Sequence, residues 1–376
     1  MLKLLLPIFL LVAAPQEPKK PAARADNEVI APGLPEGDAP QLPEQVNWDL
    51  KKAVTARTAT RERMDLGGLW RFAPVADRET APQRSEMGWI EMPGVWTSPD
   101  TPIYDSRLRV ADGQWQAKPL DEFPLAWVER DLPIGNDVVT HWLDHRSYLV
   151  LRGPWAKAEV YSSQRVNGKP KRDGEEVRED GVTVYVEPLI GVVRDGATWF
   201  ELTETMMYPH TNQVNLRLGT TAAAQPRGEN AKPEKPYVGI ELLPTGPRVD
   251  AIRLTRDAAR GELDLALDLV RPKGFMLIPG PPVNTIPLTV RLRLDDASTG
   301  QMIQKLDQAI GPMPDNKRTV SIRLPWSATR DAAPPKQARL RVRLYTTAGR
   351  LFDEAYPVEF RPDELPAATP KEERER

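Results

Sequence analysis

The sequence predicts an all-β protein built from two β-sandwiches. Apolar and polar residues alternate through several short runs, at residues 148–160, 182–186, 263–269, 288–294, 320–324 and 340–344. Alternation with a period of two is typical of antiparallel strands that bury one face. The chain has 39 prolines and 24 glycines, which separate these runs, and helical periodicity is scarce. Short strands with turn residues at regular spacing favour sandwiches over other all-β folds.

The N-terminus has the pattern of a secretory signal peptide. Residues 1–14 carry one lysine, an apolar stretch from residue 4 to residue 12, and two closing alanines. This stretch is too short to span a bilayer, so we expect a secreted or periplasmic protein; an uncleaved anchor is the alternative. Residues 15–45 are rich in Pro, Ala, Glu and Lys, and residues 363–376 have the same character. Both are predicted to be disordered, and no membrane span is expected later in the chain.

A change in composition divides the remaining chain into two predicted domains. Residues 220–235 (TTAAAQPRGENAKPEK) are small and polar, with two prolines. Most of the ten tryptophans precede this stretch, and only Trp326 follows it. Because residues 239–242 still have the pattern of a strand, we place the first domain at 46–243 and the second at 247–362.

Four motifs in the first domain, taken in order, carry a family resemblance. They are residues 66–72 (LGGLWRF), 89–96 (WIEMPGVW), 127–130 (WVER) and 149–161 (LVLRGPWAKAEVY), the last followed by Asn167, Gly168 and Lys169. Together they resemble the N-terminal sugar-binding domain of glycoside hydrolase family 2, the β-galactosidases, β-glucuronidases and β-mannosidases. The Asn-Gly pair also fits a type I′ hairpin turn, since both residues tolerate positive φ. The resemblance implies a jelly-roll-like (galactose-binding-like) sandwich for this domain.

The second domain resembles the immunoglobulin-like domain of the same family. The similar stretches are residues 247–254 (PRVDAIRL), residues 340–344 with Gly349 and residues 351–354, and Phe360-Arg361, where the family's chain leads into its catalytic barrel. The chain departs from the family around Trp326, where the expected Trp-Pro-Leu-Tyr pattern is missing. The resemblance therefore implies an immunoglobulin-like β-sandwich as the second domain.

No catalytic residue can be carried over from the family. Retaining glycosidases use two carboxyl groups about 5–5.5 Å apart, one as the nucleophile and one as the acid. In the family both lie on barrel strands, and only fifteen residues follow Arg361 here. The Asn27-Glu28 pair matches the acid signature but falls in the predicted linker. We therefore expect no glycosidase activity from this chain by itself.

Other kinds of site find no support in the sequence. The chain has no cysteine, which excludes thiolate catalysis and cysteine metal sites. His141 and His145 lack the glutamate of a zinc-protease helix, and we expect both on a surface loop. Residues 295–300 (DDASTG) lack calcium-loop spacing and are predicted as a hairpin turn. No cofactor or metal is expected, and a net charge of −2 gives no case for nucleic acid.

Aromatic residues beside carboxylates are the remaining candidates for a ligand site. Sugars stack on indole rings and pair their hydroxyls with carboxylates and amides. The insertion at residues 97–116 (TSPDTPIYDSRLRVADGQWQ) has the length of a functional loop. The candidate carbohydrate-binding residues are Trp96, Tyr104, Asp105, Asp112 and Trp115. The remaining large aromatics, Trp70, Trp89, Trp127 and Trp155, are predicted to fill the sandwich core.

Three hypotheses for function follow. The first is a secreted, non-catalytic carbohydrate-associated protein that binds a glycan or docks to a catalytic partner. The second is one part of a split or truncated β-glycosidase whose barrel is a separate chain, which an exposed apolar surface on the second domain would favour. The third is a two-sandwich envelope or adhesion scaffold. The sequence specifies neither the sugar, nor the partner, nor the oligomeric state.

Overall fold

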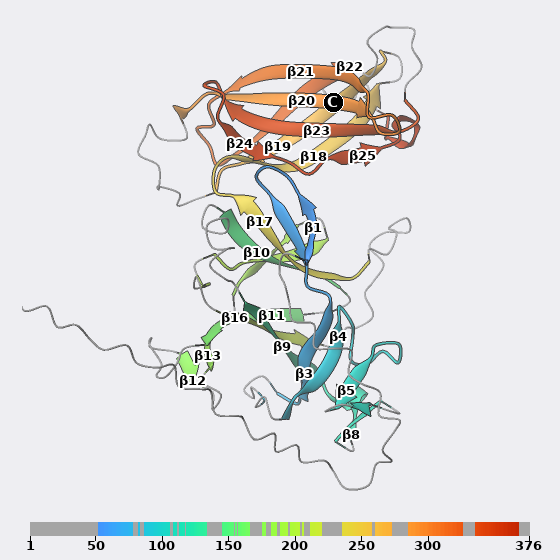
Figure 1. The fold of residues 1–376 in the computed structure, drawn as a ribbon, viewed down its shortest axis with the longest axis vertical. Helices are drawn as coiled ribbons and strands as arrows, with labels where there is room; N and C mark the ends of the chain where they lie inside the picture. Colours follow the sequence, from blue (N-terminus) through green and yellow to red (C-terminus); the bar gives the residue numbers. More distant parts are fainter. Residues whose placement is uncertain are drawn as a thin grey trace, which may run out of the picture. The chain divides into compact units, whose positions relative to one another are not determined.

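The fold of this chain is nearly all β, as the sequence predicts (Figure 1). The computed structural model describes residues 52–77, 82, 86–105, 108–110, 113–116, 118–133, 145–153, 155, 157–165, 175–177, 182–185, 189–194, 196–203, 205–206, 211–219, 235–257, 260–272, 285–325 and 335–367. The described residues contain no α-helix, and the 3-10 turns that they include in full are η2 (Leu120–Glu122) and η4 (Pro362–Glu364). The predicted signal peptide and linker lie outside the described residues.

Two large antiparallel sheets form the first sandwich. The six-stranded sheet has the order β1-β2-β17-β10-β15-β14, with β1 Val54–Arg57, β2 Glu62–Asp65, β17 Tyr237–Pro244, β10 His145–Arg152, β15 Ala197–Glu201 and β14 Gly191–Arg194. The nine-stranded sheet has the order β12-β13-β11-β16-β9-β3-β4-β5-β6, with β12 Glu175–Val177, β13 Val182–Tyr185, β11 Lys157–Arg165, β16 Thr211–Gly219, β9 Leu125–Pro133, β3 Gly68–Val75, β4 Gly88–Met92, β5 Ile103–Asp105 and β6 Leu108–Arg109. A short hairpin pairs β7 (Gln114–Trp115) with β8 (Lys118–Pro119).

The motif residues build the core between these two sheets. Trp70 and Phe72 alternate on β3 and are fully buried, and Val128 and Leu149 from β9 and β10 join the same cluster. Each such side chain contributes about 1.5–3 kcal/mol through burial alone. The Trp70 indole also donates to the Leu66 carbonyl at 2.8 Å, which satisfies its only polar group. The resemblance motifs therefore specify the framework of the sandwich.

One predicted run is divided between the two sheets. The alternation at residues 148–160 belongs to β10 in the six-stranded sheet and then to β11 in the nine-stranded sheet. The chain crosses between the sheets after Arg152, and Gly153 lies against the Trp155 ring there. Residues 148–160 are therefore two strands and not the one alternating strand that the sequence predicts, because alternation continues on both sides of the crossing. Asn167, Gly168 and Lys169 lie outside the described residues.

The second sandwich packs a three-stranded sheet on a five-stranded sheet (Figure 1). The first has the order β18-β19-β22, with β18 Arg248–Asp257, β19 Glu262–Val270 and β22 Lys317–Pro325. The second has the order β21-β20-β23-β24, with β21 Met302–Gly311, β20 Leu288–Asp296, β23 Ala338–Thr346 and β24 Leu351–Glu354, and β25 (Val358–Phe360) also pairs with β23.

Strict alternation in sequence produces the core of this sandwich. On β19 the four leucines at positions 263, 265, 267 and 269 are buried and the residues between them are half-buried. The leucines of β20 and β23 meet them from the other sheet. The stretch between β20 and β21 is the predicted turn, with Gly300 at φ +72° and Asp296 accepting from the Ser298 amide at 2.8 Å.

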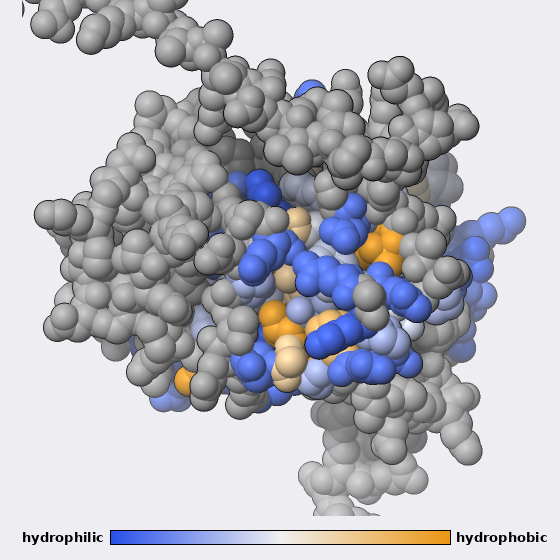
Figure 2. All heavy atoms as spheres, turned by 90° about the horizontal axis from the view of Figure 1, so that it is seen from below, coloured by the Kyte–Doolittle hydropathy of each residue, from blue (hydrophilic) through white to orange (hydrophobic). Residues whose placement is uncertain are grey.

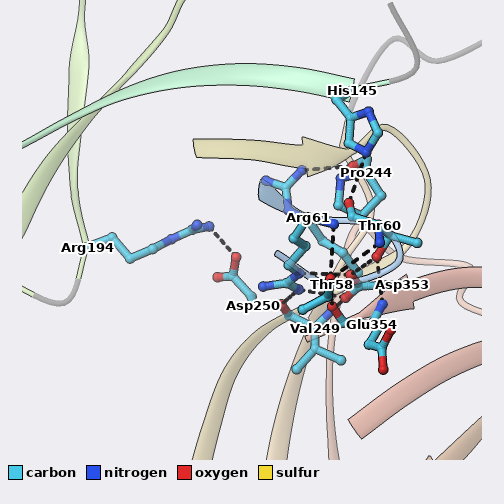
Figure 3. A network of polar contacts seen from close by, with 11 residues as sticks. Thr58, Thr60, Arg61, His145, Arg194, Pro244, Val249, Asp250, Asp353 and Glu354 are labelled. Carbon is cyan, nitrogen blue, oxygen red and sulfur yellow. Dashed lines mark hydrogen bonds and ion pairs between the residues drawn. The ribbon is translucent and has the colours of Figure 1, made fainter. Parts of the chain in front are cut away.

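A polar seam joins the two sandwiches where the β1–β2 turn meets β24 (Figure 3). Arg61 donates to both carboxylate oxygens of Asp353, from Nε at 2.8 Å and from Nη2 at 2.6 Å. Asp353 is fully buried and also accepts from the Val249 amide at 2.7 Å. Thr58 and Thr60 bond the Glu354 backbone from the same turn, at 2.8 Å and 2.7 Å. The β1–β2 turn is therefore held to the second sandwich both by an ion pair and by hydrogen bonds to the backbone.

The start of the predicted tail takes part in the second sandwich. The Arg256 amide donates to the Pro366 carbonyl at 2.8 Å, and Arg256 also forms a parallel bridge with Ala367. Residues 368–376 lie outside the described part. The boundaries 46–243 and 247–362 stay predictions, although the two hydrophobic clusters fall on either side of residue 245.

Candidate functional site

The segment between β4 and η2, which the sequence analysis singles out, folds around a cavity. β4 ends at Met92, the Met92–Pro93 peptide bond is cis, and a turn leads into β5. The Ser98 amide donates to the Val95 carbonyl at 3.0 Å, and the Thr101 amide donates to the Ser98 carbonyl at 3.2 Å. These two bonds close the turn and hold its side chains at the mouth of the cavity.

A glycine makes this turn possible. A Cβ on Gly94 would lie 2.5 Å from the Glu91 carbonyl and 2.3 Å from the Thr101 side chain. Thr101 is in turn fixed, since its hydroxyl accepts from the Val95 amide at 3.1 Å. The tight approach of backbone to backbone therefore needs glycine at this position.

The cavity, which we call the loop cavity, has a volume of about 680 Å³. Its apolar lining includes Trp96, Ile103 and Leu120, which belong to the sandwich core. Its polar lining consists of hydroxyls and one exposed carboxylate, from Thr97, Ser98, Thr101 and Asp121. Small-molecule sites of about 300–1,000 Å³ typically combine an apolar lining with a few polar groups of this kind.

The structure places the candidate carbohydrate-binding residues in different surroundings. Trp96 is 1% exposed and donates from Nε1 to the Phe123 carbonyl at 3.2 Å. Trp115 is 3% exposed and packs edge-on against Phe72, with ring centroids 5.3 Å apart. Neither indole has a free face for a sugar ring, so Trp96 contributes only to the floor of the cavity.

The other candidates lie on or near the edge strand β5. Tyr104 is half-buried and Asp105 is exposed. Ile103 of the same strand lines the loop cavity, so Tyr104 points to the opposite face of the sheet. Asp112 lies outside the described residues. The assignment of these residues to carbohydrate binding stays a prediction.

A row of side chains on the outer face of the nine-stranded sheet includes Trp89, which the sequence does not predict as a site residue. Trp89 of β4 pairs with Tyr104 of β5 on one side and with Arg71 of β3 on the other. The Arg71 guanidinium lies 5.0 Å from the Trp89 ring centroid. Trp89 was predicted as core but is only half-buried. Period-two alternation with the buried Ile90 is the signal that could have placed Trp89 outside.

A buried polar cluster occupies the same outer face. Glu129 is 1% exposed and accepts from Trp127 Nε1 at 3.0 Å and from Gln213 Nε2 at 2.8 Å. The Trp127 ring stacks on Tyr161 at 5.4 Å, and Arg217 lies over both rings. Arg217 Nε has no hydrogen-bond partner among the described residues, although Arg217 Nη1 pairs with Glu159 at 3.0 Å, and these ring and ion-pair contacts stabilise the sheet.

The histidines form no site among the described residues. His145 is buried on β10, and its Nε2 lies 3.0 Å from the Thr60 carbonyl. The expectation of a surface loop at His145 was therefore wrong, because the strand begins at this residue. His141 and His210 lie outside the described part. No group of three metal-ligating side chains occurs in the described residues, and none of their helices could span a membrane.

Figure 2 shows one face of the molecule from below the view of Figure 1. On this face the hydrophobic residues that the structure describes lie as small separate spots among hydrophilic ones. Single exposed apolar residues are normal on soluble proteins, and only large contiguous patches indicate a partner. Nothing described on this face therefore indicates an extended apolar docking surface.

Comparisons with known proteins give likeness to solved structures only. No family model matches the chain, and no curated protein matches it. A β-glucuronidase from Bacteroides uniformis is 13% identical with a TM-score of 0.48, covering 80% of this chain and 32% of its own. A glycosyl hydrolase family 2 member from Bacteroides cellulosilyticus is 12% identical with a TM-score of 0.49, covering 80% and 36%. A β-glucuronidase from Ruminococcus gnavus, in complex with uronic deoxynojirimycin, is 14% identical with a TM-score of 0.44, covering 81% and 46%.

The chain thus spans less than half the length of these three structures. All three TM-scores are below 0.5 and all three identities are below 25%. The likeness itself therefore carries no weight for function.

Proposed function

We propose that this chain is a secreted, non-catalytic carbohydrate-associated protein related to the ancillary domains of family 2 glycosidases, and that it binds a glycan in the loop cavity. The observation that carries the proposal is the position of the cavity. The insertion at residues 97–116, singled out by its length and composition, supplies much of the wall of a space large enough for a sugar unit. The ordered motifs of the first domain support the family relationship, and the N-terminal pattern supports export.

The chemistry of the lining suits sugar hydroxyls. The Asp121 carboxylate can accept from two hydroxyls, and charge-assisted bonds of this kind are the stronger ones. The hydroxyls of Thr97, Ser98 and Thr101 can both donate and accept. The core side chains beneath them offer an apolar floor to the C–H groups of a sugar. Binding therefore depends on hydrogen bonds across the mouth rather than on stacking against Trp96 or Trp115.

Calorimetric titration of the full chain with galactosides, glucuronides and mannosides tests this proposal. We expect one of these classes to bind, and Asp121→Ala to weaken binding about tenfold, the loss of one charge-assisted hydrogen bond. Asp100→Ala is the matched control, because Asp100 is an exposed carboxylate of the nearby turn between β4 and β5 and does not line the cavity. Absence of binding to every class would favour the scaffold hypothesis. Glycoside turnover that a single Asp or Glu substitution abolishes would overturn the non-catalytic assignment.

Docking to a catalytic partner is the second candidate, and a specific observation favours it. The strand β14 is at the edge of the six-stranded sheet. Ile190, Val192 and Val193 at this edge are 91%, 61% and 67% exposed. Natural edge strands usually carry charges or prolines that prevent pairing with another chain. An apolar edge fits a partner that adds a strand and covers these side chains.

A family 2 barrel expressed without its own ancillary domains is the probe for this second candidate. We expect it to associate with the chain in sedimentation experiments, and Val192→Lys to abolish the association by placing a charge on the edge. Met302→Lys, which places the same charge on an exposed apolar residue of the second sandwich, is the control. A barrel that sediments independently of the chain would count against the docking role.

A further inference from the structure

A second, smaller pocket lies at the seam between the sandwiches. It has a volume of about 320 Å³, and we call it the seam pocket. Arg63, Trp199 and Glu241 come to it from the first sandwich, and Arg248 and Tyr356 come from the second. A ligand in this space would therefore touch both sandwiches at once.

Charges in the seam pocket do not balance. Its lining contains four arginines, at positions 61, 63, 194 and 248, and two carboxylates, at positions 241 and 250. Three arginines have partners: Arg61 pairs with Asp353 behind the wall, Arg63 with Glu241 at 2.6 Å, and Arg194 with Asp250. Arg248 is the fourth, and no ion pair to it occurs among the described residues. One positive charge in the wall therefore has no carboxylate partner and lies over the Tyr148 ring, 5.5 Å from its centroid.

Arg248 is buried as well as uncompensated. It is 4% exposed, and its Nη atoms make two long contacts, to the Pro244 carbonyl at 3.5 Å and the Tyr148 hydroxyl at 3.4 Å. Its Nε is buried with no hydrogen-bond partner in the structure. Burying an arginine in this way is costly unless an anion and good hydrogen bonds compensate it.

Two more buried donors without partners belong to the same lining. They are Trp199 Nε1 and the Tyr356 hydroxyl. Burial raises the pKa of Tyr356, and the nearby Glu241 carboxylate raises it further, so the phenol keeps its proton at neutral pH. Buried donors usually have partners in native structures. Together with Arg248 Nε they make three donors without partners in one pocket lining, and an acceptor that carries negative charge would suit them.

We infer that the seam pocket binds an oxyanion, a carboxylate or sulfate group, held by Arg248 together with Trp199 and Tyr356. The planar fork of an arginine suits such groups better than any other side chain. The volume admits a small anion or the charged end of an acidic sugar. This site is separate from the loop cavity and does not depend on the proposed carbohydrate role.

The pairs around Arg248 explain why the other arginines do not bind the anion as strongly. Burial opposes the charge of Arg61, but the Asp353 carboxylate outweighs it and holds the pKa of Arg61 above its ordinary value. Glu241 acts in the same way on Arg63. Both guanidinium groups are therefore paired with carboxylates of the chain. Arg248, which has no such partner among the described residues, is the arginine that can pair with a bound anion.

Thermal unfolding of the full chain tests this site with two probes, sodium sulfate and sodium glucuronate. Each is compared with sodium chloride at equal ionic strength, and neutral glucose controls for the sugar ring. We expect the midpoint to rise and saturate with the anion, as it does when a ligand binds only the folded state. A rise with both probes assigns the site to free oxyanions. A rise with glucuronate alone assigns it to an acidic sugar.

Two variants separate binding from a structural role. Arg248→Met should abolish the anion-dependent rise, and Tyr356→Phe should weaken anion binding about tenfold. In the absence of anion both are expected to unfold at the wild-type midpoint or above it, because each removes an unsatisfied buried group. A structural role would instead lower their midpoints. Arg253→Met and Tyr345→Phe are the matched controls, on β18 and β23 but outside the pocket.

Two results would overturn the inference. The first is a wild-type midpoint that follows ionic strength alone, with no difference between sulfate, glucuronate and chloride. The second is an anion-dependent rise that Arg248→Met retains in full. Neither result would bear on glycan binding in the loop cavity, which the Asp121→Ala variant tests separately.

Discussion

Replacing Asp353 with alanine should destabilise the protein far more than replacing an exposed aspartate. Asp353 is fully buried and compensates Arg61, whose side chain is only 10% exposed. Removing one partner of a buried ion pair costs about 3–5 kcal/mol, because the other charge stays buried alone. The Val249 amide also loses its acceptor, which adds about 1 kcal/mol or more.

The matched control is Asp307→Ala. Asp307 accepts two bonds from Arg291, at 2.8 Å and 3.1 Å, but both side chains are about 40% exposed. A surface pair of this kind contributes about 0–1 kcal/mol. Urea unfolding followed by tryptophan fluorescence and circular dichroism measures both variants, provided that the slope of the transition stays unchanged.

The double variant Arg61→Met/Asp353→Leu completes the test. It removes both charges, so it should be more stable than Asp353→Ala alone. If Asp353→Ala unfolds within about 1 kcal/mol of Asp307→Ala, the seam is not held by this buried pair and the reasoning fails.

Three further substitutions give independent checks. Gly88→Ala should lower stability by about 1–3 kcal/mol in thermal unfolding, since the new Cβ would lie 2.0 Å from the Tyr104 carbonyl; wild-type stability would contradict this. Gln116 has φ +48°, so Gln116→Val should lower the free energy of unfolding by about 1 kcal/mol or more, while Gln116→Gly should not lower it. An equal loss of stability in both variants would show that the backbone at this position is not strained. The hydrogen bond from Arg253 depresses the pKa of Asp268, so its stabilisation is present above the unfolded pKa and is lost as pH falls through the folded pKa. Below about pH 4 the free energy of unfolding of Asp268→Asn, measured in urea, should therefore change less with pH than that of the wild type. The same change of this free energy with pH in both proteins would exclude the effect.

The strands were predictable wherever one face of the sheet is buried. The leucines of β19 recur at every second position, with Asp264, Ala266 and Asp268 between them, so period two alone locates that strand. The same rule fails at residues 148–160, because the chain changes sheets at Gly153 while the alternation continues. Local pattern specifies which face of a strand is buried, but it does not specify the sheet to which the strand belongs.

The candidate site was predictable as a segment but not residue by residue. The length of the insertion at residues 97–116 correctly indicates the segment that lines the loop cavity. Its composition does not show which of its aromatic side chains are buried in the sandwich core. Trp115 is buried against Phe72, a contact over more than forty positions that no local pattern reports. The seam depends on still longer separations, since Arg61 and Asp353 are 292 residues apart. Such pairs appear only when the two sandwiches are assembled.

Hydrogen–deuterium exchange with and without a bound glycan tests the central claim most directly. The probe is whichever galactoside, glucuronide or mannoside binds in the calorimetric titration. We expect the amides of residues 95–101 and 118–123 to exchange more slowly when the glycan is bound. These residues form the turn and η2 beside the loop cavity, and a bound glycan would make local opening of their hydrogen bonds rarer. Protection confined to other strands, or no binding by any of the three sugar classes, would contradict the account.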